Sequence, residues 1–89
     1  MKNPNQFKLR SDCSVMSLRG RYLLMLPGGK TLQVNESFAW LWEVASRGLF
    51  SIDSLAKAIC DEYDSTPEDA AEQAAQTVSL WKQLDVLQS

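Results

Sequence analysis

The chain has 89 residues, of which 45% are hydrophobic and 22% charged, and its formal net charge is −2. This composition is typical of soluble folded domains and excludes a disordered or fibrous chain. The length allows one small domain and excludes a two-domain enzyme with a large cofactor cleft. The longest apolar runs have five residues, whereas a membrane span needs about 20. Because residues 1–10 also lack the apolar stretch of a signal peptide, we expect a cytoplasmic location.

The residue types that usually carry catalysis are scarce. Histidine is absent, which excludes Ser-His and Cys-His nucleophiles and most zinc sites. Cys13 and Cys60 lie far apart without a CxxC spacing, so we interpret them as unpaired thiols. Adjacent acids at 61–62 and 68–69 could serve as acid and base, but at helix termini such pairs ordinarily complement the helix dipole. We therefore predict a protein that is not an enzyme, with no catalytic residue, cofactor or metal.

The charges are divided unevenly along the chain. Residues 1–34 hold six basic side chains and one acidic side chain, a sum of +5, whereas residues 35–89 hold three basic and ten acidic, a sum of −7. The two halves can pair with each other in the fold, or they can form two electrostatic faces. In the second case, the basic half favours an acidic peptide ligand.

The first half has the pattern of a small antiparallel sheet. Residues 14–18 and 21–26 are rich in Val, Leu, Met and Tyr, and an Arg-Gly pair separates them at hairpin spacing. A Pro-Gly-Gly turn follows, and residues 30–34 then alternate apolar and polar side chains. Residues 6–10 also alternate and predict an extended arm. We therefore predict a three-stranded β-meander.

The second half has helical periodicity. Asn35 is a suitable N-cap for a first helix that ends near Gly48, and a second helix is predicted over residues 51–63. A third helix is predicted from Thr66 to about Leu84, with Pro at its first position and acids in its first turn. The fold class is therefore α+β, a three-stranded antiparallel β-meander followed by three helices, which is the outline of a winged helix-turn-helix domain. The predicted parts of this single domain are an arm at 1–13, the meander at 14–34 and the helices at 35–87.

The third helix is apolar over a wider arc than one packed face requires. We assign to the core the residues that share one direction on the helix, namely Ala71, Ala74, Val78 and Trp81. Further small or apolar residues extend the arc on one flank, namely Ala70, Thr77, Leu80 and Leu84. This helix is either buried on two sides, or its flank lines a groove.

The second strand is apolar on both faces. Tyr22 and Leu24 point one way, with Leu26, while Leu23 and Met25 point the other way. A small sheet with helices on one side should be polar on its outer face. We therefore expect the N-terminal arm or a second subunit to cover that face, so a homodimer is one hypothesis.

The first and third strands of a meander are edges, and an open edge can accept an added strand. The third strand leads directly into the first helix, so its edge is expected near the third helix. That arrangement would set a strand-accepting edge beside an apolar groove. Such a site suits an extended peptide, which gains affinity from main-chain hydrogen bonds and selectivity from side chains in the groove.

The start of the predicted helical half resembles a family signature. The matching residues are Val34-Asn35-Glu36-Ser37, Ala39, Leu41-Trp42-Glu43 and Gly48. They are similar to the signature of PqqD-like proteins, which belong to the recognition elements of ribosomally made, post-translationally modified peptides (RiPPs). Residues 51–64 and 81–87 are similar to the second helix and the closing segment of that family. The resemblance covers about residues 14–88. It departs from the family pattern at Val34, Phe38 and Asp85, where the family usually has Leu, a small residue and Gly.

The resemblance implies both a fold and a function. PqqD-like proteins have a three-stranded sheet packed on three helices and no catalytic activity. They bind the leader region of a precursor peptide as an added strand and present it to a modifying enzyme, in the PqqD case a radical SAM enzyme. Carried onto this sequence, the peptide edge is Lys30, Thr31, Leu32, Gln33 and Val34. The helix wall is Ala70, Gln73, Thr77 and Leu80.

Two alternatives remain open at this point. A winged-helix domain could bind DNA, but the third helix carries Glu68, Asp69 and Glu72 against Lys82 alone. Recognition helices normally carry Lys and Arg for phosphates and bases, so we expect no nucleic acid partner. The other alternative is a structural homodimer or partner subunit, which the two-faced second strand favours.

Overall fold

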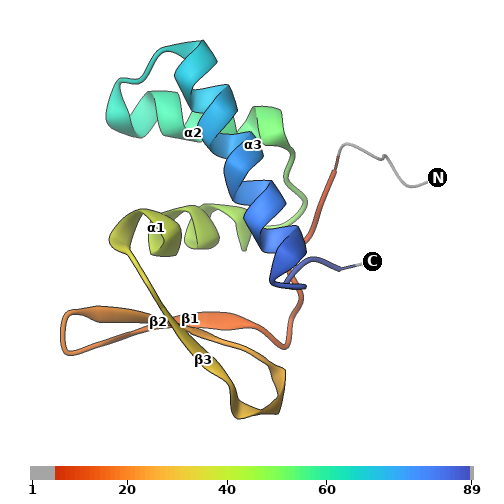
Figure 1. Cartoon of the computed structure of the whole chain (residues 1–89). Helices are drawn as coiled ribbons and strands as arrows, with labels where there is room; N and C mark the ends of the chain where they lie inside the picture. Colours follow the sequence, from red (N-terminus) through yellow and green to blue (C-terminus); the bar gives the residue numbers. More distant parts are fainter. Residues whose placement is uncertain (1–5, 89) are drawn as a thin grey trace.

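Three antiparallel strands precede three helices in the computed structural model, which describes residues 6–88 (Figure 1). The strands are β1 (Ser14–Leu18), β2 (Arg21–Met25) and β3 (Thr31–Val34). The helices are α1 (Glu36–Ala45), α2 (Ile52–Tyr63) and α3 (Pro67–Gln83). The sheet order is β1-β2-β3 with both pairs antiparallel. The predicted α+β class and the order of its elements are confirmed.

The conformation of the β1–β2 turn depends on its two central residues. Arg19 has φ 53° and Gly20 has φ 77°. A two-residue hairpin with positive φ at both positions matches the right-handed twist of its strands. Glycine adopts this conformation without steric cost, whereas Arg19 is a non-glycine residue in the left-handed region. The turn therefore fixes the register in which Leu18 pairs with Arg21.

Each helix begins at a polar side chain that accepts a hydrogen bond from the first turn. Asn35 Oδ1 accepts from the Phe38 amide at 2.8 Å, and Thr66 Oγ1 accepts from the Asp69 amide at 3.2 Å. Ser51 caps α2 in a reciprocal arrangement with Ser54. These caps satisfy amides that have no partner within a helix, and each is worth about 1 kcal/mol. The predicted starts at Asn35 and Thr66 are confirmed.

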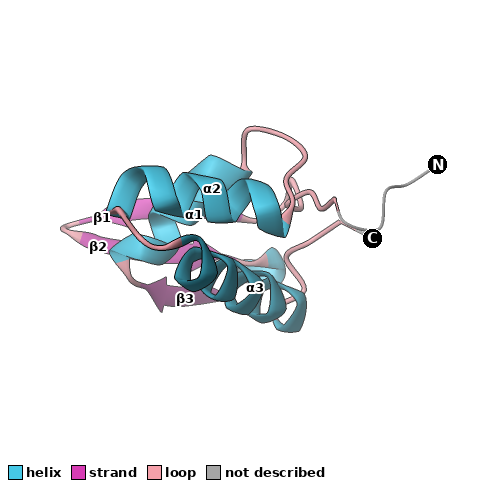
Figure 2. Cartoon of the chain, turned by 90° about the horizontal axis from the view of Figure 1, so that it is seen from above, coloured by secondary structure: helices cyan, strands magenta, loops and turns pink. Residues whose placement is uncertain are grey.

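All three helices lie on one face of the sheet, with α3 crossing over the others (Figures 1 and 2). Trp81 of α3 is completely buried at the centre of the core. The rings of Trp42 and Phe50 meet its ring edge-on, at centroid distances of 5.7 and 5.5 Å. Leu24 of β2 is also completely buried, so the sheet contributes to the same core through one face.

One predicted core position on α3 is wrong. Ala71 is exposed, whereas Ala70 is completely buried, so the inward stripe of this helix is Ala70, Ala74, Val78 and Trp81. The two alanines are equally apolar and lie one residue apart, about 100° around the helix. Hydrophobicity alone does not separate them. The packing of α3 against α2 decides which methyl group faces inward.

The N-terminal arm is extended, as predicted, but it does not cover the outer face of the sheet. Phe7 exchanges backbone hydrogen bonds with Phe50 at 2.7 and 2.9 Å, and Leu9 pairs with Leu87. Described residues 6–10 therefore run between the loop before α2 and the end of the chain. For these residues, the expectation of an arm over the sheet is wrong, and residues 1–5 lie outside the described part.

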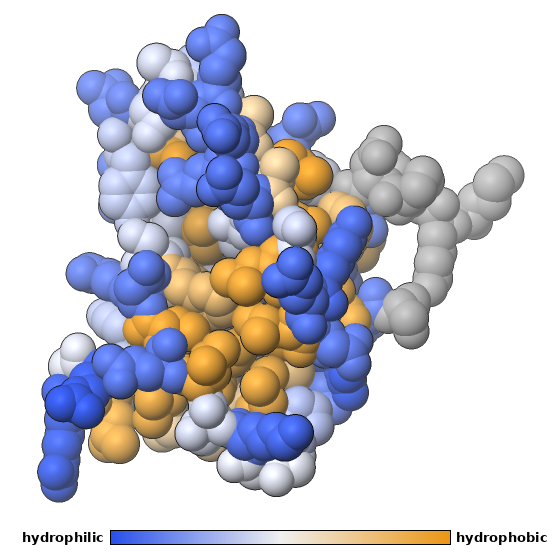
Figure 3. All heavy atoms as spheres, in the orientation of Figure 1, coloured by the Kyte–Doolittle hydropathy of each residue, from blue (hydrophilic) through white to orange (hydrophobic). Residues whose placement is uncertain are grey.

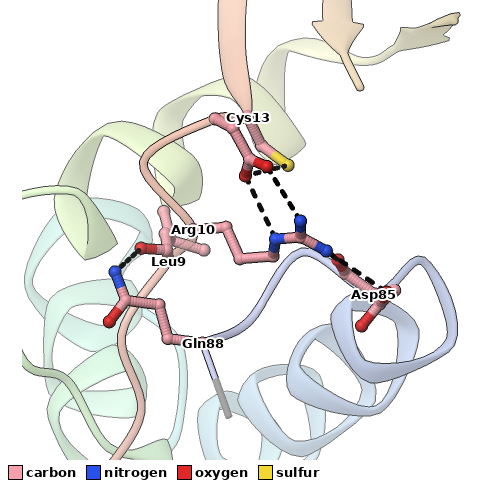
Figure 4. Close-up of polar contacts among 6 residues, drawn as sticks. Leu9, Arg10, Cys13, Asp85 and Gln88 are labelled. Carbon is pink, nitrogen blue, oxygen red and sulfur yellow. Dashed lines mark hydrogen bonds and ion pairs between the residues drawn. The ribbon is translucent and has the colours of Figure 1, made fainter. Parts of the chain in front are cut away.

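Polar contacts clamp the arm to the end of the chain (Figure 4). The Arg10 guanidinium bridges two carboxylates, at 2.8 Å from Asp12 and 3.2 Å from Asp85. Hydrogen bonding to Arg10 lowers the pKa of Asp12 below its ordinary value. Burial raises the pKa of the neighbouring Cys13 thiol, which keeps it protonated and unreactive. Both Cys13 and Cys60 are free thiols.

Candidate functional site

Strand β3 offers a row of backbone groups to an incoming chain. Within the described residues it pairs only with β2, in a register that places Leu24 opposite Leu32. The Leu26 amide donates to the Lys30 carbonyl at 2.8 Å. Because hydrogen-bonded pairs alternate along an antiparallel ladder, the next such pairs involve Leu32 and Val34.

The backbone groups of the residues between these pairs point away from the sheet. They are the amides and carbonyls of Thr31 and Gln33, two donors and two acceptors. The side chains follow the opposite division, since those of Leu32 and Val34 share the helix-side face with the buried Leu24. An added strand would therefore bond to residues 31 and 33 while its inward side chains face the helices.

An apolar groove lies beside this edge. Its volume is about 250 Å³, and it is lined by Leu32, Gln33, Val34, Asn35, Phe38, Leu80 and Leu84. Figure 3 shows apolar side chains gathered between the lower half of α3 and the sheet. None of the described residues that line the groove is charged. Its chemistry therefore suits aliphatic or aromatic side chains.

Phe38 forms part of the groove, although it was not among the predicted site residues. Its ring stacks on Trp42 at 6.2 Å and meets the edge of Trp81 at 6.1 Å. The half-buried ring joins the core to the groove. Phe38 stands at a position where the resemblance implies a small residue, and this departure was the signal that marked it. Leu84 also lines the groove and belonged to the predicted apolar flank of α3.

The structure brings some of the predicted site residues together and separates others. Leu32, Gln33, Val34 and Leu80 all line the groove, and Lys30 and Thr31 lie at the start of the same edge. Three others lie further along α3 towards its N-terminus, outside the groove lining, namely Ala70, Gln73 and Thr77.

These three α3 residues differ in what they offer a ligand. Ala70 is completely buried and has no surface for one, so its placement in the helix wall is corrected. Gln73 is exposed. The Thr77 hydroxyl donates to the Gln73 carbonyl at 2.9 Å and so is committed to its own helix.

Within residues 6–88, no group of three or more His, Cys, Asp or Glu side chains is placed to hold a metal ion. In the same range, no helix is both long enough and apolar enough to cross a membrane.

The family model for coenzyme PQQ synthesis protein D (PqqD) matches residues 20–87. The chain belongs to the PqqD family. The match spans β2, β3 and all three helices, and so includes every residue of the groove. No curated protein matches the chain in sequence.

Three solved structures share the fold of this PqqD-family chain. A lasso peptide synthetase B1 complexed with the leader peptide is 24% identical, with a TM-score of 0.74 over 93% of this chain and 98% of that one. TbiB1 in complex with the TbiA(beta) leader peptide is 14% identical, with a TM-score of 0.75 over 92% and 95%.

The third is the solution structure of the PqqD truncation of Methylobacterium extorquens PqqCD, described as a functional and stand-alone RiPP recognition element. It is 14% identical, with a TM-score of 0.75 over 99% of this chain and 94% of that one. Because all three sequence identities are below 25%, these structural matches establish the fold alone.

The PqqD-family pattern usually closes its last helix with glycine, where this chain has Asp85. Asp85 adopts φ 58°, the left-handed conformation that favours glycine. Its amide donates to the Lys82 carbonyl and the Val86 amide donates to the Trp81 carbonyl, each at 3.2 Å. These two bonds form the Schellman motif that ends many helices. The chain therefore closes α3 as glycine would, and Leu84 keeps its place in the groove.

Proposed function

We propose that this chain is a non-catalytic peptide-binding module. It captures the leader region of a ribosomally made precursor peptide as an extra strand along β3, beside the C-terminal half of α3. It then presents that peptide to a modifying enzyme. The observation that carries the proposal is the open β3 edge, with its outward backbone groups at Thr31 and Gln33, next to an uncharged apolar groove.

The geometry supports both parts of peptide recognition. Backbone bonds to Thr31 and Gln33 do not depend on the peptide's side chains, so they supply affinity without selectivity. Peptide side chains that enter between Leu32, Phe38 and Leu80 supply selectivity, because the groove excludes charge. Two structures with the same fold carry leader peptides, which favours a leader as the ligand here.

The proposed module has no catalytic role of its own and acts together with a modifying enzyme. The chain has no histidine, and the groove residues include no acid, base or thiol. The modifying enzyme is proposed to be of the radical SAM type, as membership of the PqqD family favours. The proposal places the complex in the cytoplasm and requires no nucleic acid, membrane or second copy.

Amide hydrogen exchange measured by NMR tests the proposed site residue by residue. The protein is compared alone and with the leader half of a short peptide encoded beside its gene. We expect the leader to slow exchange at Thr31 and Gln33, whose amides point outward. Leu32 and Val34 should change little, since β2 already protects their amides.

Strand β1 is the internal control, because it is the other edge of the same sheet. Its outward amides at Val15 and Ser17 should exchange equally fast with and without the leader. Protection at β1 in place of β3, or shifts confined to α2, would contradict the proposed site. Affinity should also fall as salt rises if the leader is acidic, because Arg19, Arg21 and Lys30 surround the sheet.

A further inference from the structure

The face of the sheet that points away from the helices carries apolar side chains that are exposed or half-exposed within the described residues 6–88. The strand register places Met16 opposite Leu23, while Leu18 and Met25 lie on the same face. Met16 is 45% exposed and Leu18 is 51% exposed. None of these four side chains belongs to the core or packs against it. Contiguous exposed apolar side chains of this kind mark contact surfaces.

All charges along this part of the chain are positive. Arg21 lies on the outer face beside Leu18, and Arg19 and Lys30 stand in the turns at the two ends of the meander. Residues 13–35 contain no acidic side chain. A partner that fits this surface therefore has an apolar centre with acidic side chains around it.

The same charges disfavour a second copy on this face. A symmetric dimer brings the same patch of each protomer together. Arg19, Arg21 and Lys30 of one copy would then face their equivalents, and like charges in contact cost binding energy. The described part of the arm is also not the occupant, because residues 6–10 pair with Phe50 and the chain end.

We propose that the outer face of the sheet, formed by Met16, Leu18, Arg21, Leu23 and Met25, docks the modifying enzyme through an apolar surface rimmed with acidic residues. This inference rests on the proposed function, since a module that presents a peptide must contact the enzyme. The face stays open when the leader occupies β3, because the groove lies on the helix side.

The leader strand and this face form one continuous surface. A strand added to β3 extends the sheet, and its alternate side chains point outward beside those of Thr31 and Gln33. The leader thus widens the face that Met16 and Leu23 already form. One enzyme surface can contact both the protein and the bound leader.

The test measures two affinities with purified components, the full-length protein, the leader peptide and the modifying enzyme encoded beside the gene. Leu18→Asp removes an apolar contact and adds a negative charge that opposes the acidic rim. We expect it to weaken enzyme binding about tenfold while leader affinity stays within about twofold. Arg21→Glu should also weaken enzyme binding, through charge alone.

Leu49→Asp is the matched control, because Leu49 is 67% exposed and lies in the loop before α2. It should change neither affinity. Equal enzyme binding by wild type and Leu18→Asp would overturn the inference. So would a wild-type dimer in sedimentation that Leu18→Asp dissociates, because the occupant would then be a second copy.

The two proposals fail in different ways. A wild-type protein that binds the leader but not the enzyme contradicts the docking face and leaves peptide capture intact. A wild-type protein that binds no leader contradicts the proposed function itself. Circular dichroism of each variant shows whether it is folded, and the exposed position of Leu18 predicts little loss of stability.

Discussion

The two edges of the sheet differ in chemistry more than in access. Beside β1 lies a hollow of about 430 Å³, whose lining mixes apolar and aromatic residues with three serines and the charged Glu43. The groove beside β3 is smaller, about 250 Å³, and its side chains are mainly Leu, Val and Phe. Either edge can form backbone hydrogen bonds with an added strand. The uncharged lining of the groove, rather than its size, therefore favours β3 as the peptide site.

Neighbouring residues of α1 line the groove beside β3 and the hollow beside β1. Phe38 lines the β3 groove, whereas Ala39 and Trp42 line the hollow beside β1. The Asn35 cap fixes where this helix begins and so fixes which side each of these residues faces. The predictions on leader binding below each change one edge and use the other edge as the control.

The largest expected effect comes from a charge in the groove. Leu80→Asp should weaken leader binding about 100-fold, or ~2.7 kcal/mol, because a bound peptide would desolvate the carboxylate without a partner. Leu80 is 42% exposed, so the variant should fold. Calorimetric titration with the leader measures the change. Ser17→Asp places the same charge in the β1 hollow and should leave the affinity unchanged, and equal losses in both variants would place the peptide elsewhere.

A proline at each edge tests the backbone bonds. Gln33→Pro removes one outward amide of β3 and should weaken the leader about tenfold, the net value of one or two hydrogen bonds. Proline is tolerated at edge positions whose amide faces solvent. Ser17→Pro makes the equivalent change on β1 and should bind the leader normally.

A third proline verifies the assignment of inward and outward amides. Leu32→Pro removes an amide that points to β2 and should therefore unfold the protein. Circular dichroism and peptide titration together separate the three variants. If Gln33→Pro binds as tightly as wild type, the leader does not pair with β3.

A smaller effect is expected where α1 meets the groove. Phe38→Ala should reduce affinity for the leader about fivefold, because a half-buried ring loses contact with the peptide. It should also widen the groove, so that leaders with bulkier side chains bind relatively better. Ala39→Phe fills the β1 hollow instead and serves as the control. A leader preference that is unchanged in Phe38→Ala would show that the ring only supports the core.

The elements and much of the β3 site could be predicted from local signals. Asn35 and Thr66 are good helix caps, and the Arg19-Gly20 turn has hairpin spacing, so each boundary depends on residues close in sequence. The resemblance to the PqqD family placed Leu32 and Leu80 in the site, and the edge strand and the wide apolar flank in the pattern indicate the same region. These features need no knowledge of the tertiary structure.

The details that depend on packing could not be predicted. The choice between Ala70 and Ala71 is made by contact with α2, and both are alanine. The arm pairs with Phe50 and Leu87, which are far away in sequence. Phe38 lines the groove because α1 and α3 meet beside β3, and the sequence pattern does not show where these helices meet.

A substitution at the end of α3 should change the stability of the protein without changing its affinity for the leader. Asp85→Gly should raise the free energy of unfolding by about 1 kcal/mol, since glycine adopts positive φ without the steric cost that a side chain has. The ion pair that is lost with Arg10 is exposed and contributes little. Chemical denaturation measures the gain, and leader affinity should not change. A loss of stability would show that the contact with Arg10 outweighs the strain.

The smallest predicted effect is a pH dependence of stability. It arises from the Arg10 contacts with Asp12 and Asp85, which join the start of β1 to the end of α3. Arg10 lowers the pKa of Asp12 below the ordinary 3.8, so the folded state binds fewer protons than the unfolded state in this range. The stabilisation by this contact is therefore complete above about pH 4 and is lost as the pH falls through the folded pKa. NMR titration of the Asp12 carboxyl should give a midpoint below 3.8, and Arg10→Gln should restore the ordinary value. Because Asp12 directly precedes Cys13 and Ser14, which line the β1 hollow, acid should disturb this hollow before the β3 groove. The opposite order would show that the contact acts mainly on the end of α3.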